Sequence, residues 1–177
     1  MDNFSSERLS YRRFNRENAK CFAREFSDQE YIKYYIPEPF HIYCGVELEE
    51  LLCSWNDGDK FFLFELLSKD SGSLLGLLTV DNFSPNRSIG ESAEIGILIK
   101  KEFQGLGYAR EAFSAIEKIL FDIYKVHVIY ATAASKNFAS IRLIEASNFH
   151  YSGKKEDYFL RDGEYSDLNI YCKINKE

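Results

Sequence analysis

The chain has few of the features that mark extended, secreted or membrane proteins. Its 177 residues include only 3 Pro and 10 Gly, and this composition argues against collagen-like repeats, disorder and low-complexity linkers. No apolar run approaches the ~20 residues that a membrane-spanning helix needs. The start, Met1 to Phe4, lacks the basic and apolar regions of a signal peptide. We therefore expect a folded cytoplasmic protein without a membrane partner.

Cysteine is also scarce, and its spacing does not indicate a metal site. Cys21, Cys44, Cys53 and Cys172 form no CxxC pair, and the three histidines lie far from them in sequence. No metal is expected. We interpret the four cysteines as reduced, partly buried thiols. Catalysis by a cysteine stays open, but no pattern supports it.

Basic residues are outnumbered by acidic ones. The chain has 22 Lys and Arg against 28 Asp and Glu, a net charge of −6, and a pI of about 5.2. A nucleic-acid partner is not expected, because phosphate neutralisation needs a basic surface. Apolar and aromatic residues, at 45% and 16%, are plentiful. They suffice for one core, so we expect a single domain over residues 1–177.

Hydrophobic spacing predicts alternating strands and helices. The predicted strands span residues 8–14, 60–67, 73–80, 92–100, 127–133, 151–160 and 165–174. The predicted helices span residues 16–26, 45–55, 109–124 and 137–147. Gly76 interrupts a strand, which indicates a bulge or a close backbone approach. This order predicts an α/β (α+β) fold, a mixed sheet of about six to seven strands with helices on both faces.

The segment Gln104 to Arg110 (QGLGYAR) is the most informative part of the sequence, because it follows a strand and opens a helix. Closely spaced glycines let backbone N–H groups converge, and the helix N-terminus adds positive potential there. The segment lacks the Gly-Lys-Ser/Thr ending of a P-loop and the third glycine of a dinucleotide fingerprint. A purely structural turn is the alternative. Otherwise the loop is expected to hold a pyrophosphate.

At these residues the chain resembles the GNAT superfamily of acyl-CoA-dependent N-acetyltransferases. The family pattern Gln/Arg-x-x-Gly-x-Gly/Ala matches Gln104 to Ala109, after a family-like strand, Glu94 to Ile99. More narrowly, the chain resembles the RimJ/RimL branch of protein N-terminal acetyltransferases. That resemblance rests on residues 6–12, 108–113, 137–145 and 162–167. It covers nearly the whole chain and implies a mostly antiparallel GNAT-like sheet, with acetyl-CoA as co-substrate.

The resemblance also implies which residues bind the cofactor. Backbone N–H groups of the glycine loop would hold the CoA pyrophosphate, and the strand before it would pair with the pantetheine amides. That strand and the one over residues 127–133 would splay apart into a V-shaped gap, with Asn137 and Ser140 near the thioester. The implied cofactor-binding residues are Ile97, Leu98, Ile99, Gln104, Gly105, Leu106, Gly107, Tyr108, Ala109, Arg110, Asn137 and Ser140.

The chemistry requires a base, because a lysine-like amine, with a pKa of about 10.4, is protonated at neutral pH. Glu94 is the candidate, acting directly or through water; the alternative is a carboxylate that caps the sheet edge or pairs with a lysine. A backbone N–H near Leu98 would stabilise the oxyanion. Many family members protonate the thiolate with a tyrosine, but Ile144 occupies that position. Ser140 is therefore the candidate donor, with Tyr151 or water as alternatives.

The acceptor is expected to be chosen by the first two helices and by residues 34–43 and 81–89. Acidic residues there form either an anionic mouth or a solvated face: Glu38, Glu47, Glu49 and Glu50. A peptide N-terminus or ribosomal protein fits the RimJ/RimL branch, whereas a polyamine or aminoglycoside fits the acidity.

We expect an N-acetyltransferase of EC 2.3.1 type, with a peptide N-terminus as the first choice of acceptor and a small amine as the alternative. A non-catalytic acyl-CoA-binding sensor is the other function class left open, because the usual tyrosine is missing. A homodimer is compatible with the sequence, which does not specify the oligomeric state.

Overall fold

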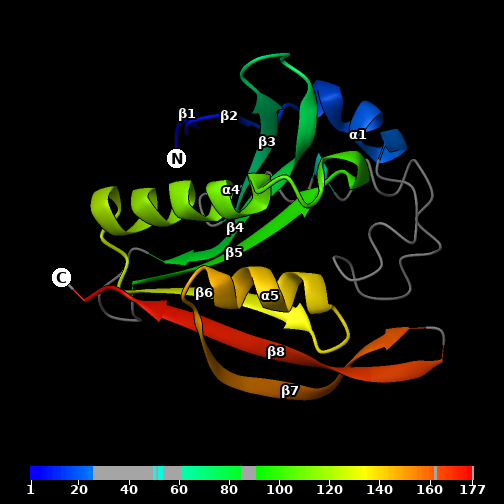
Figure 1. Cartoon of the computed structure of the whole chain (residues 1–177), viewed down its shortest axis with the longest axis vertical. Helices are drawn as coiled ribbons and strands as arrows, with labels where there is room; N and C mark the ends of the chain where they lie inside the picture. Colours follow the sequence, from blue (N-terminus) through cyan, green and yellow to red (C-terminus); the bar gives the residue numbers. More distant parts are fainter. Residues whose placement is uncertain (26–49, 51, 54–60, 85–90, 162, 177) are drawn as a thin grey trace.

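The computed structural model describes residues 1–25, 50, 52–53, 61–84, 91–161 and 163–176. Within them, eight strands form one sheet in the order β1-β2-β3-β4-β5-β6-β8-β7 (Figure 1). The strands are β1 (Phe4–Ser5), β2 (Leu9–Arg13), β3 (Phe62–Ser68), β4 (Leu74–Ser84), β5 (Ser92–Ile99), β6 (Val128–Ala134), β7 (His150–Arg161) and β8 (Glu164–Ile174). The α-helices are α1 (Ala19–Glu25), α4 (Tyr108–Lys118) and α5 (Phe138–Ala146).

Shorter helical segments extend these elements. A 3-10 helix, Arg16–Asn18, leads into α1, and a second one, Lys101–Phe103, follows β5. A π-helical turn, Ile119–Ile123, continues α4. None of the helices in the described ranges is long and apolar enough to cross a membrane.

The predicted mixed α/β architecture is confirmed, with two differences at strand ends. The structure adds β1, in which Phe4 and Ser5 pair with β2. A strand of two residues is too short to show a period, so the pattern did not indicate it. In addition, β4 continues through Asp81 to Ser84, beyond the end predicted at residue 80. Most of the predicted helix over 45–55 lies outside the described residues, as do residues 34–43 and 85–89.

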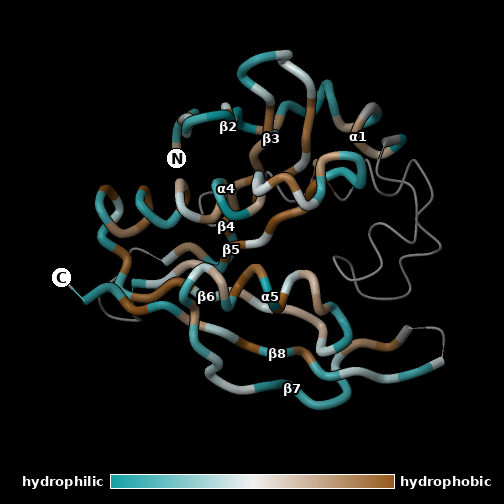
Figure 2. Tube along the Cα trace, viewed as in Figure 1, coloured by the Kyte–Doolittle hydropathy of each residue, from teal (hydrophilic) through white to brown (hydrophobic). Residues whose placement is uncertain are grey.

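Helices cover both faces of the sheet, and alternate residues of β5 pack against different helices. Ile95 and Ile99 belong to the apolar cluster that contains Ile116 of α4, and α5 packs on this same cluster. Leu98 belongs instead to the cluster around Phe22 of α1. Figure 2 shows that hydrophobic residues concentrate in central strands such as β3 and β5. The alternation predicted for β5 is therefore confirmed.

The pair β5–β6 is the one parallel pair among the described strands, and it is short. It comprises three residue pairs, the last of which joins Glu94 to Tyr130. Beyond that point β5 stays paired with β4 as far as Ile99, and β6 stays paired with β8 as far as Ala134. The edges of β5 and β6 that face each other there are not paired with one another. The two strands therefore diverge, as the resemblance implies.

Gly76 on β4 allows the close packing of β5. A Cβ at this position would lie 2.0 Å from the carbonyl oxygen of Leu98. The register between β3 and β4 also shifts here, since Leu66 pairs with Gly76 whereas Leu67 pairs with Leu74. The structure therefore has both a bulge and a close backbone approach at the predicted glycine.

Substitution of Gly76 by alanine should destabilise the sheet beside the cavity, because β5 would have to move to admit the methyl group. We expect Gly76→Ala to lower the free energy of unfolding by about 2 kcal/mol. This corresponds to a fall in Tm of about 4–8 °C, measurable by circular dichroism. Ser152→Ala, at an exposed position of β7, is the control and should leave the Tm unchanged. An unchanged Tm in Gly76→Ala would contradict the close approach.

Candidate functional site

The diverging strands border a cavity of about 960 Å³. Its walls come from β5, the loop after β5, the first turn of α4, the end of β6 and the start of α5. Every residue that the sequence analysis assigned to catalysis or cofactor binding lines this cavity, except Leu106. Leu106 is 54% exposed. The fold thus brings together residues that are spread over positions 94–140.

The glycine loop adopts a backbone conformation that favours glycine. Gly105 and Gly107 have φ values of 76° and 83°, in the left-handed region. Gly107 is the N-cap of α4, and its carbonyl accepts the first helical hydrogen bond from the Glu111 N–H at 3.1 Å. The N–H groups of residues 108–110 therefore have no acceptor within the helix. Together with the helix dipole, they make this end of the cavity attractive to an anion.

The space in front of the loop is open, and the nearby charges suit a phosphate. A Cβ at Gly105 would meet no atom within 4 Å. Lys101 and Arg110 line the same end of the cavity. The Gln104 side chain ties the loop to β5, because its Nε2 donates to the Ile99 carbonyl at 3.0 Å. The residues present therefore fit the pyrophosphate of CoA.

The other end of the cavity carries two carboxylates. Asp81 on β4 lies directly opposite Glu94 on β5, so their side chains share one face of the sheet. Both residues line the cavity. Glu94 precedes Ile99 by five residues, which is about 17 Å along an extended strand. The cavity is therefore anionic at one end and electropositive at the other.

Polar neighbours hold Glu94 in place. The Thr132 hydroxyl donates to Glu94 Oε1 at 2.7 Å, and Asn82 Nδ2 donates to Oε2 at 3.4 Å. Asn82 lies at a bulge of β4 and has a φ of 48°. Its backbone N–H donates to Asp81 Oδ1 at 2.5 Å. The bulge thus turns the Asn82 side chain toward Glu94.

The start of α5 forms a further part of the wall. Asn137 is its N-cap and accepts the Ser140 N–H at 3.2 Å through Oδ1. Ile144, which is buried, also lines the cavity. Tyr151 on β7 is 54% exposed and packs against the ring of its cross-strand neighbour Tyr171, with ring centroids 5.7 Å apart. Among the described residues, the cavity lining includes the candidate donor Ser140 but not the alternative, Tyr151.

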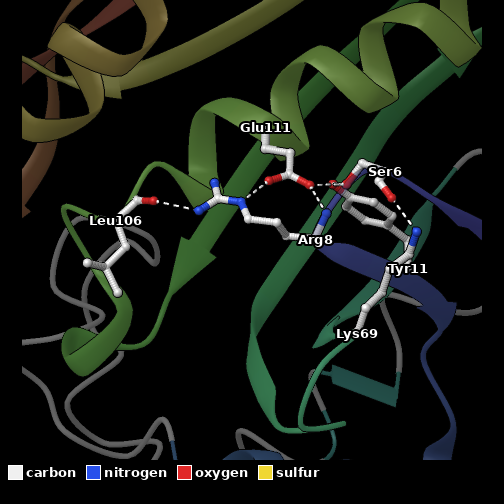
Figure 3. A network of polar contacts seen from close by, with 6 residues as sticks. All are labelled: Ser6, Arg8, Tyr11, Lys69, Leu106 and Glu111. Carbon is white, nitrogen blue, oxygen red and sulfur yellow. Dashed lines mark hydrogen bonds and ion pairs between the residues drawn. The ribbon is translucent and has the colours of Figure 1, made fainter.

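A polar network links the N-terminal segment to the glycine loop (Figure 3). Glu111 Oε1 accepts hydrogen bonds from the Ser6 hydroxyl at 2.6 Å and from the Arg8 backbone N–H at 2.7 Å. Glu111 Oε2 accepts from Arg8 Nε at 2.7 Å, and the Arg8 guanidinium also donates to the Leu106 carbonyl at 3.0 Å. Lys69 donates to the Ser6 carbonyl. The network joins the turn between β1 and β2, the turn after β3, the glycine loop and α4.

The network keeps Glu111 ionised. Burial raises the pKa of Glu111, but the hydrogen bonds from Ser6 and Arg8 outweigh it and hold the pKa below its ordinary value. The hydrogen bond to Glu111 in turn raises the pKa of the Arg8 guanidinium. Sequence reasoning did not find this pair, because 103 residues separate its members.

Sequence reasoning also missed the neighbours of Glu94. Thr132 is 38 residues from Glu94 and carries no local signal. Asp81 and Asn82 fell within a segment singled out for acceptor choice. The pair Asp81-Asn82 at the end of a strand indicates a turn. It does not indicate that the Asn82 side chain donates a hydrogen bond to Glu94.

The chain belongs to the GNAT acetyltransferase family, because the family model described as "Acetyltransferase (GNAT) domain" matches residues 8–150. Spermidine N(1)-acetyltransferase of Vibrio cholerae is 26% identical over 165 residues, covering 92% of this chain and 91% of the relative. The putative ribosomal N-acetyltransferase YdaF of Bacillus subtilis is 29% identical over 106 residues, covering 60% of this chain and 56% of the relative.

A solved structure agrees in fold. Spermidine N-acetyltransferase from Vibrio cholerae, in complex with CoA and spermine, superposes with a TM-score of 0.80 at 25% identity. The match covers 94% of this chain and 95% of that one. The protein is an N-acetyltransferase, and acetyl-CoA is its co-substrate.

A side chain at Gly107 should disturb the loop, because the residue has a φ of 83° and its Cβ would lie 3.4 Å from Arg8 Nη2. We expect Gly107→Val to raise the Kd for CoA at least about tenfold, measured by isothermal titration calorimetry, because the displaced backbone N–H groups would no longer converge on the phosphate. Gly163→Val is the matched control. Gly163 has a similar φ of 77° but lies in the β7–β8 turn and does not line the cavity.

Both valine variants should lose some stability through backbone strain, since an L-residue is disfavoured at positive φ. Only Gly107→Val should lose affinity for CoA. Equal Kd values for the two variants would contradict the assignment of the loop to the cofactor.

Proposed function

We propose that this enzyme acetylates a primary amine of a small polycation of the polyamine type. The observation that carries the proposal is the pair of carboxylates, Asp81 and Glu94, at the end of the cavity away from the glycine loop. A protonated amine is attracted to such a pair, and a second ammonium group of a polyamine can be neutralised by the second carboxylate. The cavity thereby joins an anion site and a cation site.

The glycine loop is proposed to bind the CoA pyrophosphate through the backbone N–H groups of residues 105–110, with Lys101 and Arg110 nearby. On the unpaired edge of β5, the backbone groups of Ile97 and the N–H of Ile99 are offered to the amides of the pantetheine arm, while Leu98 between them pairs with β4. An arm that runs back along β5 from the loop brings the thioester toward Glu94. Bound acetyl-CoA supplies an acetyl group activated as a thioester.

Glu94 is the proposed base. The acceptor arrives as an ammonium ion, and its nitrogen needs a free lone pair before it can attack the thioester carbonyl. Glu94 takes one proton from the ammonium, directly or through a water. The hydrogen bond from Thr132 fixes the direction of the carboxylate. A backbone N–H of β5 near Leu98 is proposed to stabilise the developing oxyanion.

The C–S bond then breaks, and the departing thiolate needs a proton. The acceptor nitrogen, after its attack, has a second proton to lose. Ser140 is the proposed relay, because its hydroxyl can donate to the sulfur while it accepts from the nitrogen side. Asn137 Oδ1 is engaged by the Ser140 N–H, which leaves the Asn137 amide group as a hydrogen-bond donor. The products are the acetylated amine, CoA and one proton, held by Glu94 until solvent removes it.

The acceptor class is supported from two sides. Relatives named for spermidine acetylation cover more than nine-tenths of the chain, in agreement with the acidic end of the cavity. A peptide N-terminus is the second candidate. The RimJ/RimL-like segments favour it, and so does the relative named a putative ribosomal N-acetyltransferase. Both acceptors present a primary amine, so they differ in the charges around it rather than in the reaction.

Replacement of the base should slow the reaction without weakening CoA binding. We expect Glu94→Gln to lower kcat about 100-fold at pH 7, measured by release of the CoA thiol. The loss should shrink as the pH rises toward the pKa of the amine, because more acceptor is then deprotonated in solution. Asp122→Asn, an exposed carboxylate outside the cavity lining, is the control. A wild-type rate and pH profile in Glu94→Gln would exclude Glu94 as the base.

The acceptor proposal is tested with a panel of spermidine, peptides with free N-termini and an aminoglycoside. We expect release of the CoA thiol with spermidine, and Asp81→Asn should raise the KM for spermidine about tenfold while the KM for acetyl-CoA stays unchanged. Acetylation of peptides alone would favour the second candidate. Binding of CoA without acetylation of any amine would favour the acyl-CoA sensor.

A further inference from the structure

Arg8 makes contacts that the turn between β1 and β2 does not itself require. It lies at the start of the segment that leads into β2, and its guanidinium reaches the first turn of α4 and the loop before it (Figure 3). The side chain is 42% exposed. An ion pair at such a position contributes only about 0–1 kcal/mol to stability. The contacts are nevertheless aimed at the segment that faces the cavity.

We propose that Arg8 is a positioning residue of the acetyl-CoA site, which orients the Leu106–Gly107 peptide toward the pyrophosphate and neutralises Glu111 beside it. The inference rests on the proposed role of the glycine loop. It assigns Arg8 no contact with the reacting atoms.

The first part of the argument is the direction of one peptide group. In a trans peptide the C=O and the N–H point in opposite directions. The Arg8 guanidinium holds the Leu106 carbonyl from outside the cavity at 3.0 Å. The Gly107 N–H therefore points away from Arg8. Gly105 and Gly107 line the cavity whereas Leu106 does not, in agreement with this orientation.

The two glycines leave the orientation of the Leu106–Gly107 peptide group poorly fixed unless another contact restrains it. Gly105 precedes Leu106, and Gly107 supplies the N–H of the Leu106–Gly107 peptide. Both glycines lie in the left-handed region. Glycine populates many backbone conformations at little cost, so a Gly-Leu-Gly segment can rotate its peptides readily. A hydrogen bond from a guanidinium removes that freedom before CoA binds. Pre-organisation of this kind raises affinity because less conformational entropy is lost on binding.

The second part of the argument is charge. Glu111 lies in the first turn of α4, where an anionic ligand is expected. An unpaired carboxylate there would repel a pyrophosphate. Arg8 compensates that charge through its Nε at 2.7 Å and its backbone N–H at 2.7 Å, while Ser6 adds a third donor. The carboxylate can thus remain ionised at the phosphate end of the cavity.

Arg8 is itself held firmly enough to act as a restraint. Its guanidinium lies 4.4 Å from the centroid of the Tyr108 ring. Its carbonyl accepts the Lys69 N–H at 2.9 Å, which ties it to the turn after β3. Arg8 therefore fixes the loop relative to the sheet, because its backbone is bonded to the turn after β3 while its side chain binds the loop.

The test compares acetyl-CoA with acetyl-pantetheine, a substrate that lacks the pyrophosphate. We expect Arg8→Gln to raise the Kd for CoA about tenfold, measured by calorimetry, because one charge-assisted hydrogen bond is lost. The KM for acetyl-CoA should also rise, while kcat stays near that of the wild type. With acetyl-pantetheine, which has no pyrophosphate, kcat/KM should equal that of wild type. Adding Glu111→Gln to Arg8→Gln should recover part of the affinity, because the uncompensated charge is removed.

Arg12→Gln is the matched control. Arg12 lies on β2 and binds Glu65, which is 1% exposed, at distances of 2.8 and 2.5 Å. This contact does not involve the glycine loop. We expect Arg12→Gln to lower the Tm while the Kd for CoA stays unchanged, the reverse of Arg8→Gln.

A wild-type Kd for CoA in Arg8→Gln would overturn the proposal, and so would an equal loss with acetyl-CoA and acetyl-pantetheine. If Arg8→Gln does not fold, Arg8→Lys replaces it. Lysine keeps the charge, but one ammonium group cannot reach both Glu111 and the Leu106 carbonyl, so the Kd should still rise. A wild-type protein that binds CoA no better than pantetheine would instead refute the role of the loop itself.

Discussion

The site depends on the short parallel pairing between β5 and β6. After Glu94 and Tyr130 the two strands have different partners, β4 on one side and β8 on the other, and each of these antiparallel pairs continues. The sheet therefore opens without losing the strands on either side of the gap. Because a backbone edge with free N–H and C=O groups needs partners, an extended ligand with amide groups suits this opening.

The helices that border the gap complete its polarity. The N-terminus of α4 meets the end of β5 through Gly105 and Gly107, so one end of the cavity presents N–H groups and a positive dipole. Glu94 lies at the other end, beside Asp81. Charge separation along one strand gives the enzyme an orientation for the anionic cofactor and for the cationic acceptor that we propose. The Arg8–Glu111 pair preserves this separation, because it compensates the one carboxylate in the first turn of α4.

Much of the geometry of the candidate cofactor site could be predicted, because its determinants are local. A glycine at a left-handed position, a helix that opens behind it and a strand that precedes it are all properties of one continuous segment. The neighbours of Glu94 and Glu111 could not be predicted in this way. Thr132 and Arg8 reach these carboxylates only because the strand order places β6 beside β5 and the start of β2 near α4. Tyr151 illustrates the converse, since it follows α5 closely in sequence but is half exposed on β7 and is not among the described residues that line the cavity.

The sequence by itself determined the alternation of strands and helices, the positions of the glycine loop and of Glu94, and membership of an acyl-CoA-dependent family. The alternation and the loop follow from hydrophobic period and backbone freedom, which act over a few residues, whereas the family was indicated by the resemblance of its motifs. Only the tertiary structure decided where β5 and β6 separate, which carboxylate faces Glu94 and which cation restrains the loop. Those outcomes depend on strand pairing between segments far apart in the chain, and side-chain spacing along one segment carries no information about the partner across the sheet.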